Sequence, residues 1–378
     1  MSSRRILLAS GLALFLAAAC TAPAPPPAPT PASLAWTEAT LPMPPGTPGR
    51  LAVLDAADCD GIWYVVGGVL GAGDATRPAA WTSADGRTWR TVTFMPLPGS
   101  YYGPEDLIYS VACSDGRVAG IGARRGGAHG NPRVSTWRGL ADGRFAEVSA
   151  AFDTYGGDRA VNVARLAAGP SGFVIAGNRT SGAAVWLSRD GASFRLFEGA
   201  PGLANDASHR TAARDAVAGT GGQWVIVGGS AAKGSAGQEP AVWLTRDGSR
   251  FTRVGVPFDA SYNELQRAVR IGDDIVAVGP RGQTIGAWRG PASALSRGGS
   301  TIAQEGTFGQ AADGVQALAA LGARLIATSG AGLWLSVDRG ATWRPLRAPA
   351  GAGKSMAVAG RPGMVLLATN GRVWTAPG

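Results

Sequence analysis

The sequence predicts an all-β fold, a seven-bladed β-propeller of four-stranded blades in which an N-terminal strand completes the last blade. Three observations predict it. Seven tryptophans recur in one local pattern, at spacings of 56, 49, 57, 45, 46 and 40 residues. A turn-forming segment and a second aromatic residue follow most of these tryptophans at a fixed distance. Glycine supplies 57 of the 378 residues, about twice its ordinary share of ~7%, which favours many tight turns over long helices.

The repeat unit contains four short strands. The seven tryptophans are Trp81, Trp137, Trp186, Trp243, Trp288, Trp334 and Trp374. A second aromatic residue lies eight positions on at Trp89, Phe145, Phe194 and Phe251, and nine positions on at Trp343. Each such pair is expected to pack across a hairpin, and two further apolar stretches precede each hairpin, as at residues 216–218 and 223–227. Four strands repeated around a ring form a propeller, whose closure protects the sheet edges.

A turn with a hydroxyl and a carboxylate two residues apart lies between the paired aromatics. These pairs are Ser83 with Asp85, Ser188 with Asp190, Thr245 with Asp247, and Ser336 with Asp338. Both side chains can accept hydrogen bonds from the amides of the turn, and the glycine that follows tolerates a positive φ.

This pattern resembles the Asp-box, or BNR, repeat Ser-x-Asp-x-Gly-x-x-Trp, which residues 336–343 match at every specified position. The repeat at Trp137 lacks the hydroxyl, and the repeat at Trp288 lacks the turn motif. The resemblance covers nearly all of residues 34–378 and implies a propeller similar to those of sialidases, sortilins and photosystem assembly factors. It also implies that the four turn pairs are structural and lie on the face opposite the ligand-binding one.

The ends of the repeat array predict how the ring closes. The sequence stops at Gly378, four residues after Trp374, so the last repeat lacks a fourth strand. Residues 34–39 look like an orphan fourth strand in which Trp36 aligns with Trp89 and Trp343. We therefore expect the N-terminal strand to complete blade seven, at about 49 residues per blade, with Trp36 as a core residue.

The first 33 residues predict export and anchoring. Residues 1–19 read as a signal peptide, with Arg4 and Arg5 before an apolar segment and a small-residue cleavage zone. Cys20 follows in a context that resembles a lipoprotein lipobox, so we expect it to carry a lipid, and the Pro/Ala-rich residues 20–33 to form an extended stalk. A freely secreted protein cleaved near Ala19 is the alternative, and residues 3–8 also look like a twin-arginine export signal. The expected location is the cell membrane, facing the periplasm or cell exterior.

Composition excludes several classes of function. The net charge of +9 comes almost entirely from arginine in an Ala- and Gly-rich background, which codon bias explains. No basic run interleaved with aromatics is present, so we expect no nucleic-acid partner. Two His and three Cys are too few for the common metal centres, and we expect no metal and no cofactor. Cys59 and Cys113 occupy matching contexts and can form a disulfide after export, the alternative being two separate buried thiols.

The connectors between blades carry the candidate binding residues. They hold aromatics beside acids and arginines, a mixture that suits a peptide or a sugar, although long connectors also collect such residues to pack their own loops. The candidates are Tyr101, Tyr102, Asp153, Tyr155, Arg159, His209, Arg210, Tyr262 and Glu264. We expect Tyr102, Tyr155 and Tyr262 to be exposed loop residues. We expect a monomeric, non-enzymatic protein that binds an envelope or extracellular protein or glycan.

A divergent sialidase-like glycoside hydrolase is the alternative. It would use Tyr262 or Glu264 as nucleophile and base, and Arg159 or Arg210 as anion clamps. The Arg-Ile-Pro motif that opens the sialidase arginine triad is absent from the sequence, which favours the non-enzymatic interpretation.

Overall fold

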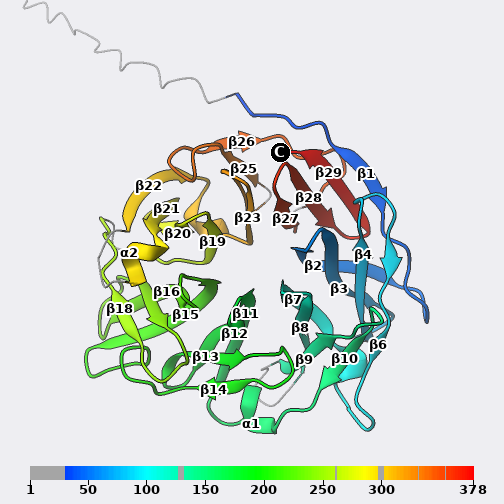
Figure 1. Ribbon diagram of the computed structural model, residues 1–378, viewed down its shortest axis with the longest axis horizontal. Coiled ribbons are helices and arrows are strands. Elements are labelled where there is room, and N and C mark those ends of the chain that lie inside the picture. Colours follow the sequence, from blue (N-terminus) through cyan, green and yellow to red (C-terminus); the bar gives the residue numbers. More distant parts are fainter. Residues whose placement is uncertain (1–29, 127–131, 260–261, 297–301, 331, 354) are drawn as a thin grey trace, which may run out of the picture.

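Seven antiparallel sheets radiate from a central axis, which confirms the predicted seven-bladed propeller (Figure 1). The computed structural model describes residues 30–126, 132–259, 262–296, 302–330, 332–353 and 355–378. The predicted signal peptide and Cys20 therefore lie outside the described residues. Each blade is a meander whose first strand lies nearest the axis and whose fourth strand lies at the rim (Figure 1).

The blades follow one another in chain order. Blades 1 to 3 contain β2 (Arg50–Cys59), β3 (Ile62–Leu70), β4 (Thr76–Ser83) and β5 (Arg90–Thr91); β7 (Leu107–Ser114), β8 (Arg117–Arg124), β9 (Arg133–Gly139) and β10 (Phe145–Val148); and β11 (Ala160–Gly169), β12 (Gly172–Arg179), β13 (Gly182–Ser188) and β14 (Arg195–Phe197). A short strand of the first connector, β6 (Phe94–Met95), pairs in parallel with β10, so blade 2 has a fifth strand.

Blades 4 to 7 repeat the arrangement. They contain β15 (His209–Ala218), β16 (Trp224–Ala232), β17 (Glu239–Thr245) and β18 (Thr252–Val254); β19 (Arg267–Ile271), β20 (Asp274–Arg281), β21 (Thr284–Pro291) and β22 (Ala303–Phe308); β23 (Ala317–Leu321), β24 (Arg324–Ser329), β25 (Gly332–Ser336) and β26 (Arg344–Leu346); and β27 (Ala357–Arg361), β28 (Met364–Thr369), β29 (Arg372–Pro377) and β1 (Thr37–Thr40). Two single-turn helices, α1 (Phe152–Tyr155) and α2 (Ala292–Ser296), lie outside the sheets.

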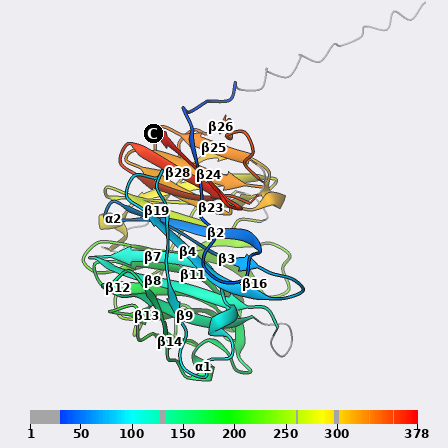
Figure 2. The same ribbon diagram turned by 90° about the vertical axis from the view of Figure 1, so that its right-hand side faces the viewer.

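The strand β1 completes blade 7, as the sequence predicts. It pairs antiparallel with β29, with Thr37 opposite Thr375 and Thr40 opposite Arg372. Just before it, Ala32 forms a parallel bridge with Leu346 at the end of β26. The N-terminal segment therefore runs along the rims of blades 6 and 7 and joins both (Figures 1 and 2).

The repeat tryptophans occupy one position of the blade. Each lies in the third strand, and six of the seven are at most 2% exposed. In each blade with a second aromatic residue, the repeat tryptophan pairs with a residue of the fourth strand, and the second aromatic lies two positions before that partner. In blade 1, Trp81 pairs with Thr91, and Trp89 lies two positions before Thr91. Trp36 has the same place relative to Glu38 and Trp374, which confirms its alignment.

The expectation that Trp36 is a core residue is wrong. Its side chain is only partly buried, packing against the core cluster between blades 6 and 7. Its indole N–H donates to the Arg347 carbonyl over 3.3 Å. The physical reason is that no hairpin turn joins β29 to β1. The indoles of Trp89 and Trp343 donate to the carbonyls of Gly86 and Gly340 in their own turns, and Trp36 has no such turn to pack beneath.

The Ser/Thr-x-Asp turns join neighbouring blades as well as closing hairpins. In the first turn, the Gly86 amide donates to Ser83 Oγ over 2.8 Å, and the Arg87 amide donates to Asp85 Oδ1 over 2.8 Å. Gly86 has φ of +72°, and an added Cβ would lie 2.5 Å from a methyl group of Thr375 in blade 7. Glycine is therefore required here both for the turn conformation and for contact with the preceding blade.

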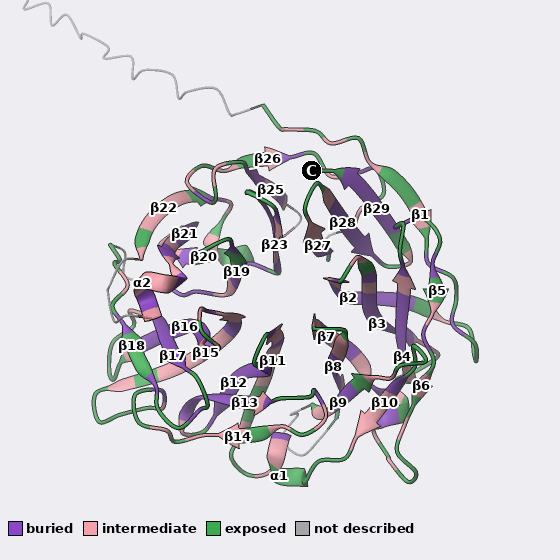
Figure 3. Ribbon diagram, in the orientation of Figure 1, coloured by how far each residue is buried: buried purple, intermediate pink, exposed green. Residues whose placement is uncertain are grey.

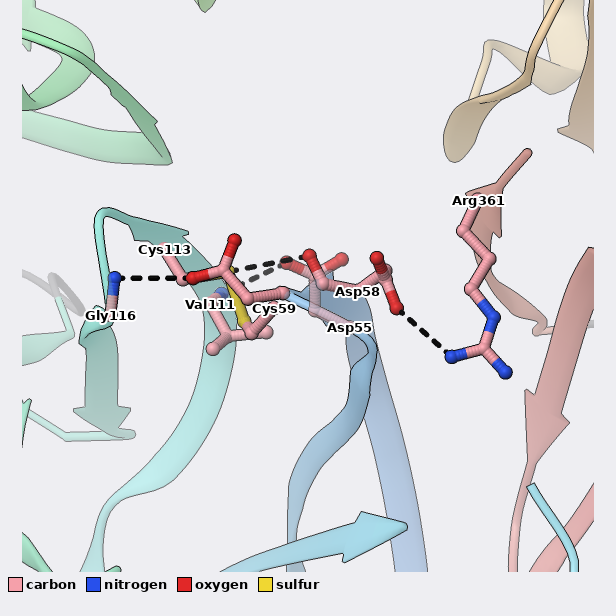
Figure 4. The surroundings of a disulfide bond; sticks show 8 residues. Asp55, Asp58, Cys59, Val111, Cys113, Gly116 and Arg361 are labelled. Atoms are coloured by element: carbon pink, nitrogen blue, oxygen red, sulfur yellow. Dashed lines mark hydrogen bonds and ion pairs between the residues drawn. A yellow bond between two sulfur atoms is a disulfide. The ribbon is translucent and has the colours of Figure 1, made fainter. Parts of the chain in front are cut away.

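A disulfide joins Cys59 to Cys113, with Cα atoms 5.6 Å apart, which decides between the two alternatives left open by the sequence (Figure 4). The two cysteines end equivalent innermost strands, β2 and β7. Beside the disulfide, the Gly116 amide donates to Asp60 over 3.1 Å, and Arg361 lies 3.6 Å from Asp58. Blades 7, 1 and 2 are thus linked near the axis.

Candidate functional site

The connectors between blades share one face of the ring with the loops between second and third strands. Direct contacts show this: the Asn205 amide donates to the Ser181 carbonyl over 2.8 Å, and the Asn263 amide donates to the Gln238 carbonyl over 2.7 Å. We call this surface the connector face. The remaining turns, including the Ser/Thr-x-Asp turns, form the opposite turn face.

Exposed aromatic side chains gather on the connector face. Within the described residues, the large aromatics exposed by more than a third are Tyr101, Phe152, Phe258 and Tyr262, at 71%, 63%, 47% and 38%. All four lie in connectors. Figure 3 shows that exposed positions are common in the connectors, whereas the strands are mostly buried. Aromatic side chains left in water at one surface are typical of binding sites.

A groove of about 1150 Å³ opens between blades 1 and 2 on this face. Its lining includes Arg50, Leu54, Asp74, Tyr101, Tyr102, Arg124 and Arg125. The two tyrosine rings meet edge to face with centroids 4.9 Å apart. The Arg124 guanidinium lies 5.6 Å from the centre of the Tyr101 ring. The groove therefore combines aromatic faces with Arg50, Arg125 and Asp74, and with Arg124, which is paired with Glu105.

An apolar socket of about 360 Å³ lies between blades 2 and 3. Its lining includes Tyr109, Ala123, Pro132, Val134, Tyr155, Val161 and Val163. Val161 is 47% exposed. The Tyr109 hydroxyl donates to the Val163 carbonyl over 2.9 Å, so the socket retains few free polar groups. Its size and lining suit an aliphatic or aromatic side chain.

β-Bulges direct several lining residues of the groove and the socket toward the axis. The pairing of the first and second strands shifts by one residue around Leu54, Tyr109, Ala164 and Arg214, in four successive blades. A bulge re-aims the extra side chain out of the regular alternation. Leu54 consequently lines the groove, and Tyr109 and Ala164 line the socket.

Asp106 is buried beneath the tyrosine connector. It follows the short 3₁₀ turn at Gly103–Glu105 and has no exposed surface. The Trp137 indole N–H donates to Asp106 Oδ2 over 3.1 Å. Burial raises the pKa of this carboxyl to about 8, so it is mostly protonated at neutral pH.

A second polar cluster lies at the connectors of blades 4 and 5. Glu264 is 1% exposed, and Arg214 Nε and Gln238 Nε2 each lie 2.8 Å from its Oε1, while Gln266 Nε2 donates to Oε2 over 2.9 Å. Burial raises the pKa of the nearby Tyr262 hydroxyl, and the charge of Glu264 adds to that shift. Both carboxylate oxygens are thus occupied by donors.

The nine candidate residues lie in separate groups. Tyr101 and Tyr102 line the groove, and Tyr262 lies near Glu264. The others lie outside these two groups: Asp153 and Arg210 are exposed, Arg159 pairs with Glu198 over 2.9 Å, and His209 lies 3.5 Å from Asp206.

The expectation that the connector tyrosines are exposed is wrong for Tyr155. This residue is 8% exposed and packs near Trp186, with ring centroids 6.1 Å apart. The short helix α1 turns its side chain inward, where it lines the base of the socket.

Sequence reasoning missed the arginines of the groove and a charged network at the axis. Arg165 Nη2 donates to Asp55 Oδ1 over 2.8 Å, although they belong to blades 3 and 1. Asp55 and Asp215 also accept backbone amides of the next blade, from Val111 over 3.0 Å and from Ala268 over 3.1 Å. The signal was present as a polar residue within each apolar innermost strand.

Within the described residues, no three His, Cys, Asp or Glu side chains are grouped so as to hold a metal ion. The same part of the chain contains no helix long and apolar enough to cross a membrane.

Comparison with known proteins shows the fold alone. No family model matches the sequence, and no curated protein matches it. Among solved structures, the chain is similar to YCF48 from Cyanidioschyzon merolae, with TM-score 0.54 and 13% identity over 91% of this chain and 98% of that one. It is also similar to the extracellular domain of a proposed one-component system from B. thetaiotaomicron, with TM-score 0.54 and 10% identity over 90% of this chain and 39% of that one. A Trypanosoma rangeli sialidase mutant with trans-sialidase activity matches with TM-score 0.47 and 11% identity, over 91% of this chain and 59% of that one. The two matches with a TM-score of 0.54 support the β-propeller fold and nothing more specific.

Proposed function

We propose that this protein is a non-enzymatic, exported and lipid-anchored propeller that binds an extended segment of an envelope or extracellular protein across its connector face. The observation that carries the proposal is the groove between blades 1 and 2, where Tyr101, Tyr102 and three arginines meet. Aromatic and arginine side chains dominate the energetics of protein interfaces. The arginines favour an acidic segment.

The neighbouring socket favours a peptide over a glycan as the occupant. Its lining is largely apolar, and its volume of about 360 Å³ suits one large apolar side chain. A sugar in that place would bury hydroxyl groups without partners, which costs free energy. A peptide that lays acidic residues along the groove can place an apolar residue in the socket.

The glycoside hydrolase alternative has weaker support. Glu264 is 1% exposed and is held by Arg214, Gln238 and Gln266, so its carboxylate presents almost no surface to a substrate. Arg159 is paired with Glu198. A general base must lie within hydrogen-bond reach of its substrate with a lone pair available.

Affinity capture from envelope extract tests the proposal. The purified domain should capture a specific partner, and Tyr101→Ala/Arg125→Ala should reduce that capture at least tenfold, since both side chains are exposed in the groove. The matched control is Ile62→Ala/Arg87→Ala, which removes the same kinds of exposed side chain from the turn face. A second control, Asp190→Ala, removes turn hydrogen bonds on that face and should lower stability without reducing capture.

Two outcomes contradict the proposal. One is full capture by the groove variant. The other is hydrolysis of a fluorogenic sialoside or glycoside by the wild-type domain that Glu264→Gln abolishes, which would instead support the hydrolase.

A further inference from the structure

Arginines cross several of the interfaces between neighbouring blades, here called seams, on the turn face. In three seams, an arginine of the preceding blade donates to a backbone carbonyl in the Ser/Thr-x-Asp turn of the next blade. Arg361 donates to Ala84 over 3.5 Å, Arg289 donates to Asp338 over 3.3 Å, and Arg117 donates to Arg189. These contacts cover the seams between blades 7 and 1, 5 and 6, and 2 and 3.

The seam between blades 3 and 4 is different. No arginine hydrogen bond crosses it among the described residues of the turn face, and a cavity of about 1070 Å³ lies there. The two turns that begin at Ser188 and Thr245 form its walls. Phe173, Phe197 and Trp224 contribute to its lining. The cavity is of the size that holds a small ligand.

The cavity carries an excess of positive charge. Arg117, Arg189, Arg195 and Arg246 line it, against two carboxylates, Asp190 and Asp247. Each carboxylate accepts hydrogen bonds within its own turn, which lowers its pKa and keeps it charged. The four arginines therefore exceed the acids of the lining by two charges, and one of them, Arg117, is paired over 3.3 Å with Asp115 outside the lining.

Two of the arginines are available to a ligand. Arg189 and Arg246 are exposed, and within the described part of the chain their side chains make no hydrogen bond or ion pair. Arg195 lies over the Phe197 ring, with its guanidinium carbon 4.9 Å from the ring centre. Ser171, Ser193 and Ser249 add hydroxyl groups to the lining.

We propose that this cavity binds an acidic oligosaccharide, one whose sugar rings carry carboxylate or sulfate groups. Free guanidinium groups pair with such anions, often through two hydrogen bonds. Serine hydroxyls match the hydroxyl groups of sugar rings, whereas Phe173 and Trp224, at 0% and 2% exposed, form only the floor of the cavity. The site lies on the opposite face from the peptide groove and does not depend on peptide binding there.

The position of the cavity disfavours a lipid surface. The described chain enters at the rim of blades 6 and 7, and blades 3 and 4 lie at the far side of the ring (Figures 1 and 2). A membrane that held the N-terminus would therefore meet the other side first. An excess of two charges within a concave site is also far less than the basic stripe that a nucleic-acid duplex requires.

Fluorescence anisotropy with labelled oligosaccharides tests the inference. The probes are a galacturonate hexamer and a sulfated heparin-derived hexamer, with neutral maltohexaose as the reference. The wild-type domain should bind at least one acidic probe, with an affinity that falls as salt rises, and should not bind maltohexaose. Arg189→Gln/Arg246→Gln should weaken binding at least tenfold without changing the melting temperature.

The matched control is Arg87→Gln/Arg324→Gln, which removes the same charge from exposed positions elsewhere on the turn face. This control should change the affinity for the acidic probe less than twofold. The groove variant Tyr101→Ala/Arg125→Ala should leave that affinity unchanged. Equal losses in both arginine pairs would overturn the inference, because general surface charge would then explain binding. Failure to bind either acidic probe, or tighter binding to anionic vesicles or duplex DNA, would overturn it as well.

Discussion

Asp106→Asn should remove a pH dependence from the stability of the propeller. In the native protein this carboxyl has no exposed surface, and its pKa lies near 8 instead of the ordinary 3.8. The folded state therefore keeps the proton over a range in which the unfolded chain releases it. The stabilising contribution is fully present below pH 3.8 and is lost as pH rises through about 8.

The size of the change in stability follows from the pKa shift of Asp106. Each pKa unit corresponds to about 1.4 kcal/mol, so this single group lowers the free energy of unfolding by roughly 1.4 kcal/mol per pH unit across that window. An asparagine has nearly the same shape, carries no titrating proton, and its carbonyl oxygen can accept the Trp137 N–H in place of Asp106 Oδ2. The variant should therefore gain stability relative to wild type as the pH rises from 5 to 8.

Urea denaturation followed by tryptophan fluorescence at pH 5, 6, 7 and 8 measures this difference. The gap between variant and wild type should widen at each step, and it should level off above pH 8. Parallel stability profiles for the two proteins would refute the reasoning, because Asp106 would then titrate normally. A conserved urea m-value would show that the native state itself is unchanged.

Two further predictions concern the N-terminal region. Trp36→Ala should lower the free energy of unfolding by about 1–2 kcal/mol, less than the ~3–5 kcal/mol of a fully buried tryptophan, because its side chain is only partly buried at the rim; urea denaturation that shows no loss would contradict the role of β1 in closing the ring. Cys20→Ala should release the protein from the membrane fraction without altering its melting temperature, and unchanged fractionation would contradict the lipid anchor.

Local features predicted most of the fold. A tryptophan in the third strand and an aromatic residue at the following turn are close in sequence, so their spacing reports the hairpin directly. Counting these hairpins predicted seven blades, and the unpaired segment around Trp36 predicted where the ring closes. Burial of Trp36 was overestimated, since the alignment with Trp89 takes no account of the hairpin turn that covers Trp89 and is missing before β1.

The candidate site was predicted only in part. Tyr101 and Tyr102 were identified from composition and do line a groove. Their arginine partners were missed, because Arg50 begins β2 and Arg124 and Arg125 lie at the end of β8, and these strands meet only when blades 1 and 2 pack together. Tyr155 was assigned to the surface although one turn of helix directs it inward.

The sequence by itself determined the repeat, the number of blades and the chemistry of the turns, because each depends on residues within one hairpin. Only the tertiary structure decided which polar residues meet. Arg165 reaches Asp55 two blades away, and Cys59 meets Cys113 across 54 residues. The physical reason is that the groove, the socket and these polar contacts lie at seams between blades or near the axis, where neighbours are set by the twist and packing of sheets and not by proximity along the chain.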